Sequence, residues 1–336
     1  MYHERHFHTS TLLENGNVLV VGGTGARGVL ASVERYDPSS DRWHAASPLA
    51  TGRYYQSATR LVNGCVLVVG GFSDLPRADA ELYEPAVDRW HAAGSMSTVR
   101  GLHSATLLAD GQVLVVGGDA SEGAGAGTGT FGCAEMFDPA RYTWRRVRSP
   151  SAASDYHTAS RLNDETVLLV GGAGPSGAVA TAELFDAVWN AWCIAPALQS
   201  SRLRHTATLL ADGRLLVVGG DDGTSNYLSS AELYSSITHQ WSAAGSLLSG
   251  REFCTATLLP LDRVLVVGGD GSPGRLASAE LYDAATNAWR IAGRLSEARY
   301  LHTATRLLDG RVLVAGGVGT SGALASVELF CFDDKH

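Results

Sequence analysis

The sequence has little of what marks a disulfide-stapled, membrane-spanning or nucleic-acid-binding chain. Its five cysteines are odd in number and show no Cys-x-x-Cys spacing, so neither a disulfide framework nor a structural zinc site is expected. No apolar run approaches the roughly 18 to 20 residues that span a bilayer, and residues 1–5 lack the blocks of a signal peptide. With a net charge of −8 and no basic stretch, the chain is not expected to bind nucleic acid. We therefore expect a soluble chain without membrane contact, and its compartment is not indicated.

Lysine is scarce as well, and the familiar short motifs of enzymes are missing. The chain contains no Gly-x-Ser-x-Gly, no His-Glu-x-x-His and no phosphate-binding loop, so a serine hydrolase, a zinc peptidase or a nucleotide hydrolase is not indicated. Glycine, in contrast, is abundant at 39 of 336 residues, and apolar residues form 45% of the chain. This balance favours many tight turns around a well-buried core with little helix.

A repeat is what the sequence has in quantity. A Gly-Gly pair ends an apolar, mostly β-branched run in seven places, a glutamate follows each pair, and a tryptophan follows six of the seven glutamates at constant spacing. An arginine at a constant distance after each tryptophan completes the unit, except that Ser154 takes its place once. The first glycines of the pairs are Gly22, Gly70, Gly117, Gly171, Gly219, Gly268 and Gly316.

Each copy predicts four short strands, which we call a, b, c and d. In one copy, residues 205–210 and 215–220 form strands a and b, joined by an Asp-Gly dipeptide that is typical of tight hairpins. Strand c carries the glutamate, and strand d opens on the tryptophan. A sheet that is apolar on both faces cannot bury itself alone, whereas seven packed around an axis can. The prediction is an all-β, seven-bladed β-propeller with four antiparallel strands per blade, formed by residues 1–336 as a single domain.

The order Gly-Gly, then Tyr or Phe, then Trp in each copy resembles the kelch repeat, and the resemblance covers essentially the whole chain. It implies a propeller of kelch repeats. At the ends, Glu328 predicts a tryptophan just after His336, and Arg5 predicts one before Met1. One blade is therefore expected to be incomplete at the chain termini, with residues 1–4 partly filling its edge, unless the natural chain is longer.

The length differences between copies all fall in the segment that joins strand b to strand c, the b–c loop. In an antiparallel blade this loop lies on the same face as the d–a connection, and function on a rigid scaffold usually lies in variable loops. We therefore predict a monomeric binding module that recognises a protein segment or a small ligand on this face, around the central channel. The predicted ligand-binding residues are Tyr55, Gln56, Phe72, Arg77, Tyr156, Arg204, Tyr227 and Arg275. A carbohydrate-binding propeller is a further interpretation, with exposed Tyr227 and Phe72 as its sign.

One column at the start of strand a carries histidine in five of the seven copies, with Gln56 and Cys254 in the other two. Imidazoles that converge on the channel mouth could bind a transition metal such as copper, iron or zinc, or an anion when protonated. The same column is equally explained by a structural role, in which each imidazole bonds a neighbouring blade. The predicted metal ligands are His8, His103, His157, His205 and His302.

The arginine and glutamate columns indicate a repeated structural ion pair. The copy with Ser154 lacks the arginine, so its Glu183 is expected to be freer to act.

A second resemblance concerns the channel mouth. The stretch 53–57 (Arg-Tyr-Tyr-Gln-Ser) is similar to the Arg-x-Tyr-Gln-Ser stretch of galactose oxidase and the glyoxal oxidases, and Tyr156-His157 is similar to their Tyr-His pair. The resemblance implies copper at the mouth, with Tyr55, Tyr156 and His157 among its ligands. It supplies the alternative function, a metal-dependent, copper-oxidase-like enzyme. The cysteine that these oxidases crosslink to tyrosine falls on His8, a departure that argues against radical copper chemistry.

Overall fold

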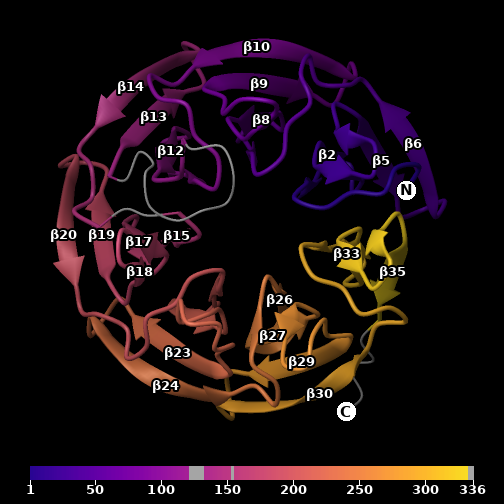
Figure 1. Ribbon diagram of the computed structural model, residues 1–336. Coiled ribbons are helices and arrows are strands. Elements are labelled where there is room, and N and C mark those ends of the chain that lie inside the picture. Colours follow the sequence, from indigo (N-terminus) through magenta and orange to yellow (C-terminus); the bar gives the residue numbers. More distant parts are fainter. Residues whose placement is uncertain (121–131, 153–154, 332–336) are drawn as a thin grey trace.

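Short antiparallel sheets follow one another around an axis and close into a ring (Figure 1). The computed structural model describes residues 1–120, 132–152 and 155–331. Six sheets have four strands and the seventh has three. The predicted fold class, a seven-bladed β-propeller with one incomplete blade, is confirmed.

The strands of each blade run outward from the axis in chain order. The a strands are β1 (Thr9–Leu12), β7 (Ser57–Arg60), β11 (Ser104–Leu107), β15 (Thr158–Arg161), β21 (Thr206–Leu209), β26 (Thr255–Leu259) and β31 (Thr303–Arg306). The b strands are β2 (Val18–Val21), β8 (Val66–Val69), β12 (Val113–Val116), β16 (Val167–Val170), β22 (Arg214–Val218), β27 (Arg263–Val267) and β32 (Val312–Ala315). The c strands are β5 (Val33–Asp37), β9 (Asp79–Glu84), β13 (Ala134–Asp138), β19 (Ala182–Asp186), β23 (Ser230–Ser235), β29 (Ser278–Asp283) and β35 (Val327–Phe330). The d strands are β6 (Arg42–Ala46), β10 (Arg89–Ser95), β14 (Thr143–Val147), β20 (Ala191–Ala195), β24 (Gln240–Ser246) and β30 (Ala288–Arg294).

Several b–c loops fold into small ribbons of their own. Three are two-stranded hairpins, and in the sixth blade a ribbon joins the residues before strand a to the residues after strand b. The elements are β3 (Thr24–Gly25) with β4 (Gly28–Val29), β17 (Ala173–Gly174) with β18 (Gly177–Ala178), β33 (Val318–Gly319) with β34 (Gly322–Ala323), and β25 (Arg251–Glu252) with β28 (Asp270–Gly271). A short 3-10 turn, η1 (Pro260–Asp262), joins β26 to β27.

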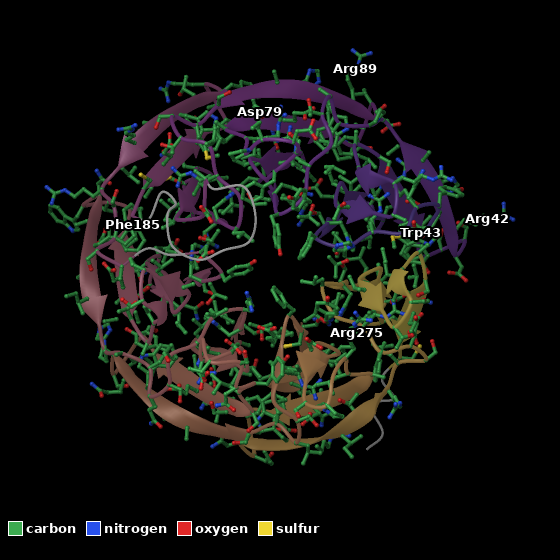
Figure 2. All side chains as sticks on the ribbon, viewed as in Figure 1. Arg42, Trp43, Asp79, Arg89, Phe185 and Arg275 are labelled. Carbon is green, nitrogen blue, oxygen red and sulfur yellow. The ribbon has the colours of Figure 1, made fainter. Side chains whose placement is uncertain are left out.

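The hydrophobic core lies between the blades. Every residue of β2, β8, β12 and β16 is buried, because each b strand is covered by the neighbouring blades on both of its faces. Trp90 of strand d packs on Tyr83 of strand c, with ring centroids 5.0 Å apart. Its indole N–H donates to the Ser47 carbonyl of the preceding blade at 2.7 Å, so the tryptophan links two blades. In contrast, Arg42 and Arg89 extend outward from the outer strands (Figure 2).

The N-terminus lies beside the seventh blade, whose last described strand is β35 (Figure 1). In the described part of the chain, no fourth strand pairs with β35. Residues 1–4 do not fill that edge, which corrects the prediction. The Met1 ammonium donates to the Ala325 carbonyl at 3.2 Å, just as the Leu49 amide donates to Ala31 in the next blade at 2.9 Å. Residues 1–4 therefore take the path of a d–a connection and close the ring there.

The Gly-Gly pairs allow neighbouring blades to approach each other closely. Gly219 and Gly220 have φ values of 67° and 94°, a region that side chains with a Cβ rarely adopt. A Cβ on Gly219 would lie 2.6 Å from the carbonyl oxygen of Arg251, which belongs to the next blade. A side chain at this position would therefore push the two blades apart.

We expect Gly219→Ala to lower the free energy of unfolding by roughly 2–5 kcal/mol, since backbone strain and overpacking add there. Gly177 is a matched control, because it also has a positive φ of 110° but a Cβ would meet nothing within 4 Å. Gly177→Ala should cost about 1–2 kcal/mol from strain alone. Urea unfolding measures both, and equal losses would contradict the close-approach explanation.

A buried arginine stands at six of the seven junctions between blades, and Ser154 takes its place in the sequence of the fourth blade. Arg202 is fully buried, and its guanidinium donates to the Gly219 carbonyl at 2.8 Å and to Glu232 at 2.7 Å. Its own carbonyl accepts the Gly172 amide of the preceding blade at 2.8 Å. Five further arginines make the same contacts, which confirms that the two columns are structural ion pairs. They are Arg5, Arg53, Arg100, Arg251 and Arg299.

Glu183 is not freer than the other glutamates, so that prediction is wrong. It is 4% exposed and accepts three hydrogen bonds, from the Ser151 amide (2.9 Å), the Ser151 hydroxyl (3.0 Å) and the Ala152 amide (2.8 Å). Ser154 lies outside the described residues, as does most of the longest b–c loop, 119–132.

Arg202→Ala should lower the free energy of unfolding by about 3–5 kcal/mol, because it leaves the buried Glu232 carboxylate without its counter-charge. Arg214→Ala is the control, since Arg214 pairs with Asp212 at the surface, with exposures of 34% and 37%. That change should cost less than about 1 kcal/mol. Similar losses in both variants would show that the junction arginines are not what holds the blades together.

Candidate functional site

The five histidines lie between blades rather than converging on the axis. The Nε2 atom of each imidazole forms a hydrogen bond with a hydroxyl on strand a of the preceding blade. The bonds join His8 to Thr303 (3.0 Å), His103 to Ser57 (2.9 Å), His157 to Ser104 (2.8 Å), His205 to Thr158 (2.9 Å) and His302 to Thr255 (3.0 Å). Gln56 stands in the same column and donates to the Val21 carbonyl at 2.9 Å.

These contacts favour the structural explanation of the histidine column. Burial, followed by the charge of the nearby junction arginine, lowers the pKa of His103, His205 and His302 to about 3, so these imidazoles are neutral at ordinary pH. Within the described ranges, no three His, Cys, Asp or Glu side chains gather so as to hold a metal ion. Cys254 takes the same column in the sixth blade, where burial raises the pKa of its thiol to about 11.

The histidines predict how stability changes with pH. The folded pKa of His205, about 3, lies below its ordinary value of 6.5, so the unfolded chain binds the proton more strongly. The stabilisation is therefore complete above pH 6.5 and is lost as the pH falls towards 3. His205→Gln, which places there the residue of the second blade, should reduce the slope of unfolding free energy against pH by about 1.4 kcal/mol per pH unit in this window. Urea unfolding across that range measures the slope, and an unchanged slope would contradict the assignment.

The residues that face the axis come one position before this column. All seven have a positive φ between 49° and 58°, although none is glycine. Such a conformation costs roughly 1–2 kcal/mol per residue. These residues, which we call the mouth ring, are Phe7, Tyr55, Leu102, Tyr156, Arg204, Phe253 and Leu301.

Backbone hydrogen bonds around the axis hold the mouth ring. The amide of one member donates to the carbonyl of the member on the preceding blade, as from Tyr55 to Phe7 (3.2 Å) and from Arg204 to Tyr156 (3.1 Å). Leu102, Phe253 and Leu301 make the same bond. The strained backbone is therefore fixed by the ring of blades, and it turns the seven side chains inward.

Four members of the mouth ring are linked by side-chain contacts. The hydroxyl oxygens of Tyr55 and Tyr156 lie 3.3 Å apart. The guanidinium carbon of Arg204 lies 4.8 Å from the ring centroid of Tyr156 and 4.9 Å from that of Phe253. Arg204 also donates to Glu252 at 3.1 Å. Burial raises the pKa of both tyrosines, so both phenols are neutral.

An aromatic cluster covers the first and second blades at the mouth. The rings of Phe7 and Tyr55 have centroids 3.9 Å apart, and Tyr54 lies 5.7 Å from Phe72. Phe72 is only 6% exposed, so it forms part of the wall. It does not provide the exposed aromatic surface that the carbohydrate-binding interpretation requires.

Carboxylates follow one another on the third to sixth blades, close enough for the charges of neighbouring members to act on each other. We call this group the acidic arc; it consists of Asp119, Asp155, Asp221, Glu252 and Asp270. Members that follow a Gly-Gly pair form backbone bridges with the residue that follows a junction arginine, as Asp221 does with Leu203. None of the five is among the predicted ligand or metal residues. Aligning the residue after each Gly-Gly with the residue after each junction arginine could have found them.

The remaining predicted ligand residues are bonded within their own blade or to the next blade. Arg77 donates to Asp79 at 2.8 Å. Tyr227 donates to Asp270 of the acidic arc at 3.3 Å. Arg275 reaches towards the seventh blade, where it donates to the Gly319 carbonyl (Figure 2). The structure thus brings Tyr55, Phe72, Tyr156 and Arg204 together at the mouth, whereas Gln56 lies between blades.

The Kelch motif family matches residues 15–50 and 202–248. These residues therefore carry the Kelch motif, and the ring of blades defines the class: the chain is a seven-bladed β-propeller. A comparison with curated protein sequences found no match.

Two solved structures share the fold. One is a fungal alcohol oxidase of the AA5 family in complex with copper, 18% identical, with a TM-score of 0.80 over 97% of this chain and 74% of its own. The other is YjhT, 16% identical, with a TM-score of 0.67 over 87% of this chain and 99% of its own. At these identities the likeness concerns the fold. The described residues also contain no helix long and apolar enough to cross a membrane.

Proposed function

We propose that the chain is a binding module that recognises a protein segment or a small ligand at the mouth ring, on the face of the b–c loops. The observation that carries the proposal is the mouth ring itself. Seven residues larger than glycine hold a costly positive φ there, and such strain is concentrated at functional positions.

The contrast with the neighbouring columns supports the same conclusion. The junction arginines and the imidazoles repeat from blade to blade, and their hydrogen bonds go to residues of the strands that build the ring. The mouth ring does not repeat, since it combines two leucines, two phenylalanines, two tyrosines and one arginine. Buried aromatic and arginine side chains are the usual anchors of binding sites.

Parallel selections test the proposal and separate the two kinds of ligand. A displayed library of linear peptides and a fragment set followed by ligand-observed NMR are each screened against the intact protein. Binders are then compared on Tyr55→Ala, Tyr156→Ala and the opposite-face control Leu308→Ala, whose side chain is 72% exposed at an a–b turn.

We expect at least one mouth variant to weaken the binders about tenfold or more, corresponding to 1.4 kcal/mol or above. Leu308→Ala should leave their affinity unchanged. Peptides among these binders would identify a protein segment, and fragments a small ligand. No binder, or binders sensitive to Leu308→Ala and to neither tyrosine, would contradict the proposal.

A metal-dependent enzyme is the second candidate, because Tyr55 and Tyr156 bring two phenol oxygens within 3.3 Å at the position that resembles a copper site. The residues fit such a site poorly. His157 is bonded to Ser104 at 2.8 Å between blades, and Phe7 rather than a cysteine packs on Tyr55. No catalytic step is therefore derived through a metal.

Metal content after incubation with copper, iron or zinc separates this candidate from the first. Stoichiometric metal that is lost in His157→Ala or His205→Ala would favour the enzyme. The binding module predicts no stoichiometric metal in the protein or in either variant. The predicted monomeric state can be checked in the same samples by light scattering.

A further inference from the structure

Three buried carboxylates of the acidic arc share one neighbouring guanidinium among the described residues. Asp155, Asp221 and Glu252 are between 2% and 7% exposed. Arg204 is the positive charge that acts on Asp155 and on Glu252, and it donates its hydrogen bond to Glu252. One guanidinium therefore faces several buried carboxylates on consecutive blades, an arrangement that is costly unless another cation is present.

Asp155 provides a second and independent observation. Its side chain is 2% exposed, yet its Oδ1 atom has no hydrogen-bond partner among the residues that the structure describes. Asp155 directly precedes Tyr156 of the mouth ring and forms a backbone bridge with Ala173, and the charges of Asp119 and Arg204 both act on its carboxyl group. Burial, and then the charge of Asp119, raises the pKa of Asp155 to about 6. A buried carboxylate oxygen without a donor is suited to accept a hydrogen bond from a ligand.

The aromatic rings beside the arc are arranged to accept positive charge. Tyr156 and Phe253 each lie within 5 Å of the Arg204 guanidinium, so a cation already rests between two aromatic faces. Tyr55 continues this surface, since its hydroxyl meets that of Tyr156. Aromatic faces next to carboxylates form the usual chemistry of an ammonium site.

We propose that the acidic arc binds an organic cation, namely a ligand that carries a protonated amine, with Asp155 as the acceptor and Tyr156 beside it. This rests on the proposed function and names the chemistry of its ligand. An organic cation fits better than a metal ion, because the described side chains provide no cluster of three metal ligands. The amine has two possible sources, a small polyamine or a lysine side chain of a protein segment, and both present the same ammonium group.

Calorimetric titration of the intact protein tests the proposal with 1,5-diaminopentane, with a lysine-containing peptide and with 1,5-pentanediol as the neutral match of the diamine. Asp155→Asn removes the charge with almost no change of shape. Asp110→Asn makes the same chemical change in an exposed a–b turn on the opposite face.

We expect the diamine or the peptide to bind, the diol to give no heat, and Asp155→Asn to weaken the affinity about tenfold or more. Asp110→Asn should have no effect. Thermal unfolding checks that Asp155→Asn is folded; if it is not, Glu252→Gln is the second charge-neutral variant, and a similar loss is expected. Preference for the diamine or for the peptide then identifies the source of the amine.

Three results would overturn the inference. They are no binding of either amine, amine binding that survives both charge-neutral variants, and Asp155-dependent binding of Ca²⁺ or Mn²⁺ alone in place of the amines. Neutral or anionic binders that depend on Tyr55 or Tyr156 would also overturn it while leaving the binding module in place. If no ligand of any charge depends on the mouth ring, both proposals fail together.

Discussion

The ion pair of the buried arginine, present at six of the seven blade junctions, is the interaction on which the rest of the structure depends. Its guanidinium joins strands b and c of its own blade, through the Gly-Gly carbonyl and the glutamate, while its carbonyl is held by the blade before. An ion pair of this kind has to recover a desolvation penalty of several kcal/mol, and the surrounding backbone acceptors make that possible. The repeat thus specifies the angle and distance between neighbouring blades at nearly every step around the ring.

The ring is closed by the same interaction, a buried arginine that pairs with a glutamate. Arg5 binds Glu34 in the first blade, and its carbonyl accepts the Gly317 amide of the last blade at 2.9 Å. The first and last blades are therefore joined like any other pair, although the last has only three strands. Because the junctions fix the arrangement of the blades, the residue directly before each histidine position can adopt a strained backbone conformation. The type of side chain at that position can also differ from blade to blade. The mouth ring and the acidic arc are the result.

The repeat made most of the fold predictable. Seven Gly-Gly pairs and six tryptophans at constant spacing identify blades, strands and the missing strand without any structure. The candidate site was less predictable, because adjacent residues such as Tyr55 and Gln56 look equally able to face the axis. A positive φ at Tyr55 turns it inward and directs Gln56 towards Val21 of the preceding blade. Sequence spacing does not reveal that turn, which is why the histidines were placed at the axis.

The acidic arc escaped prediction for a related reason. Asp155 and Asp221 occupy different columns of the repeat, and only the backbone pairing across each blade brings those columns to one edge. Their proximity arises only when the blades assemble into the ring, so it cannot be seen in any single copy of the repeat.

The most direct test of the account is a crystal structure of the protein with a ligand selected on the loop face. We predict that the ligand contacts Tyr55, Tyr156 or Arg204, while the bonds from Arg202 to Glu232 and from His205 to Thr158 stay unchanged. A ligand bound at the a–b turns, or a metal ion coordinated by His157 and His205, would contradict the account.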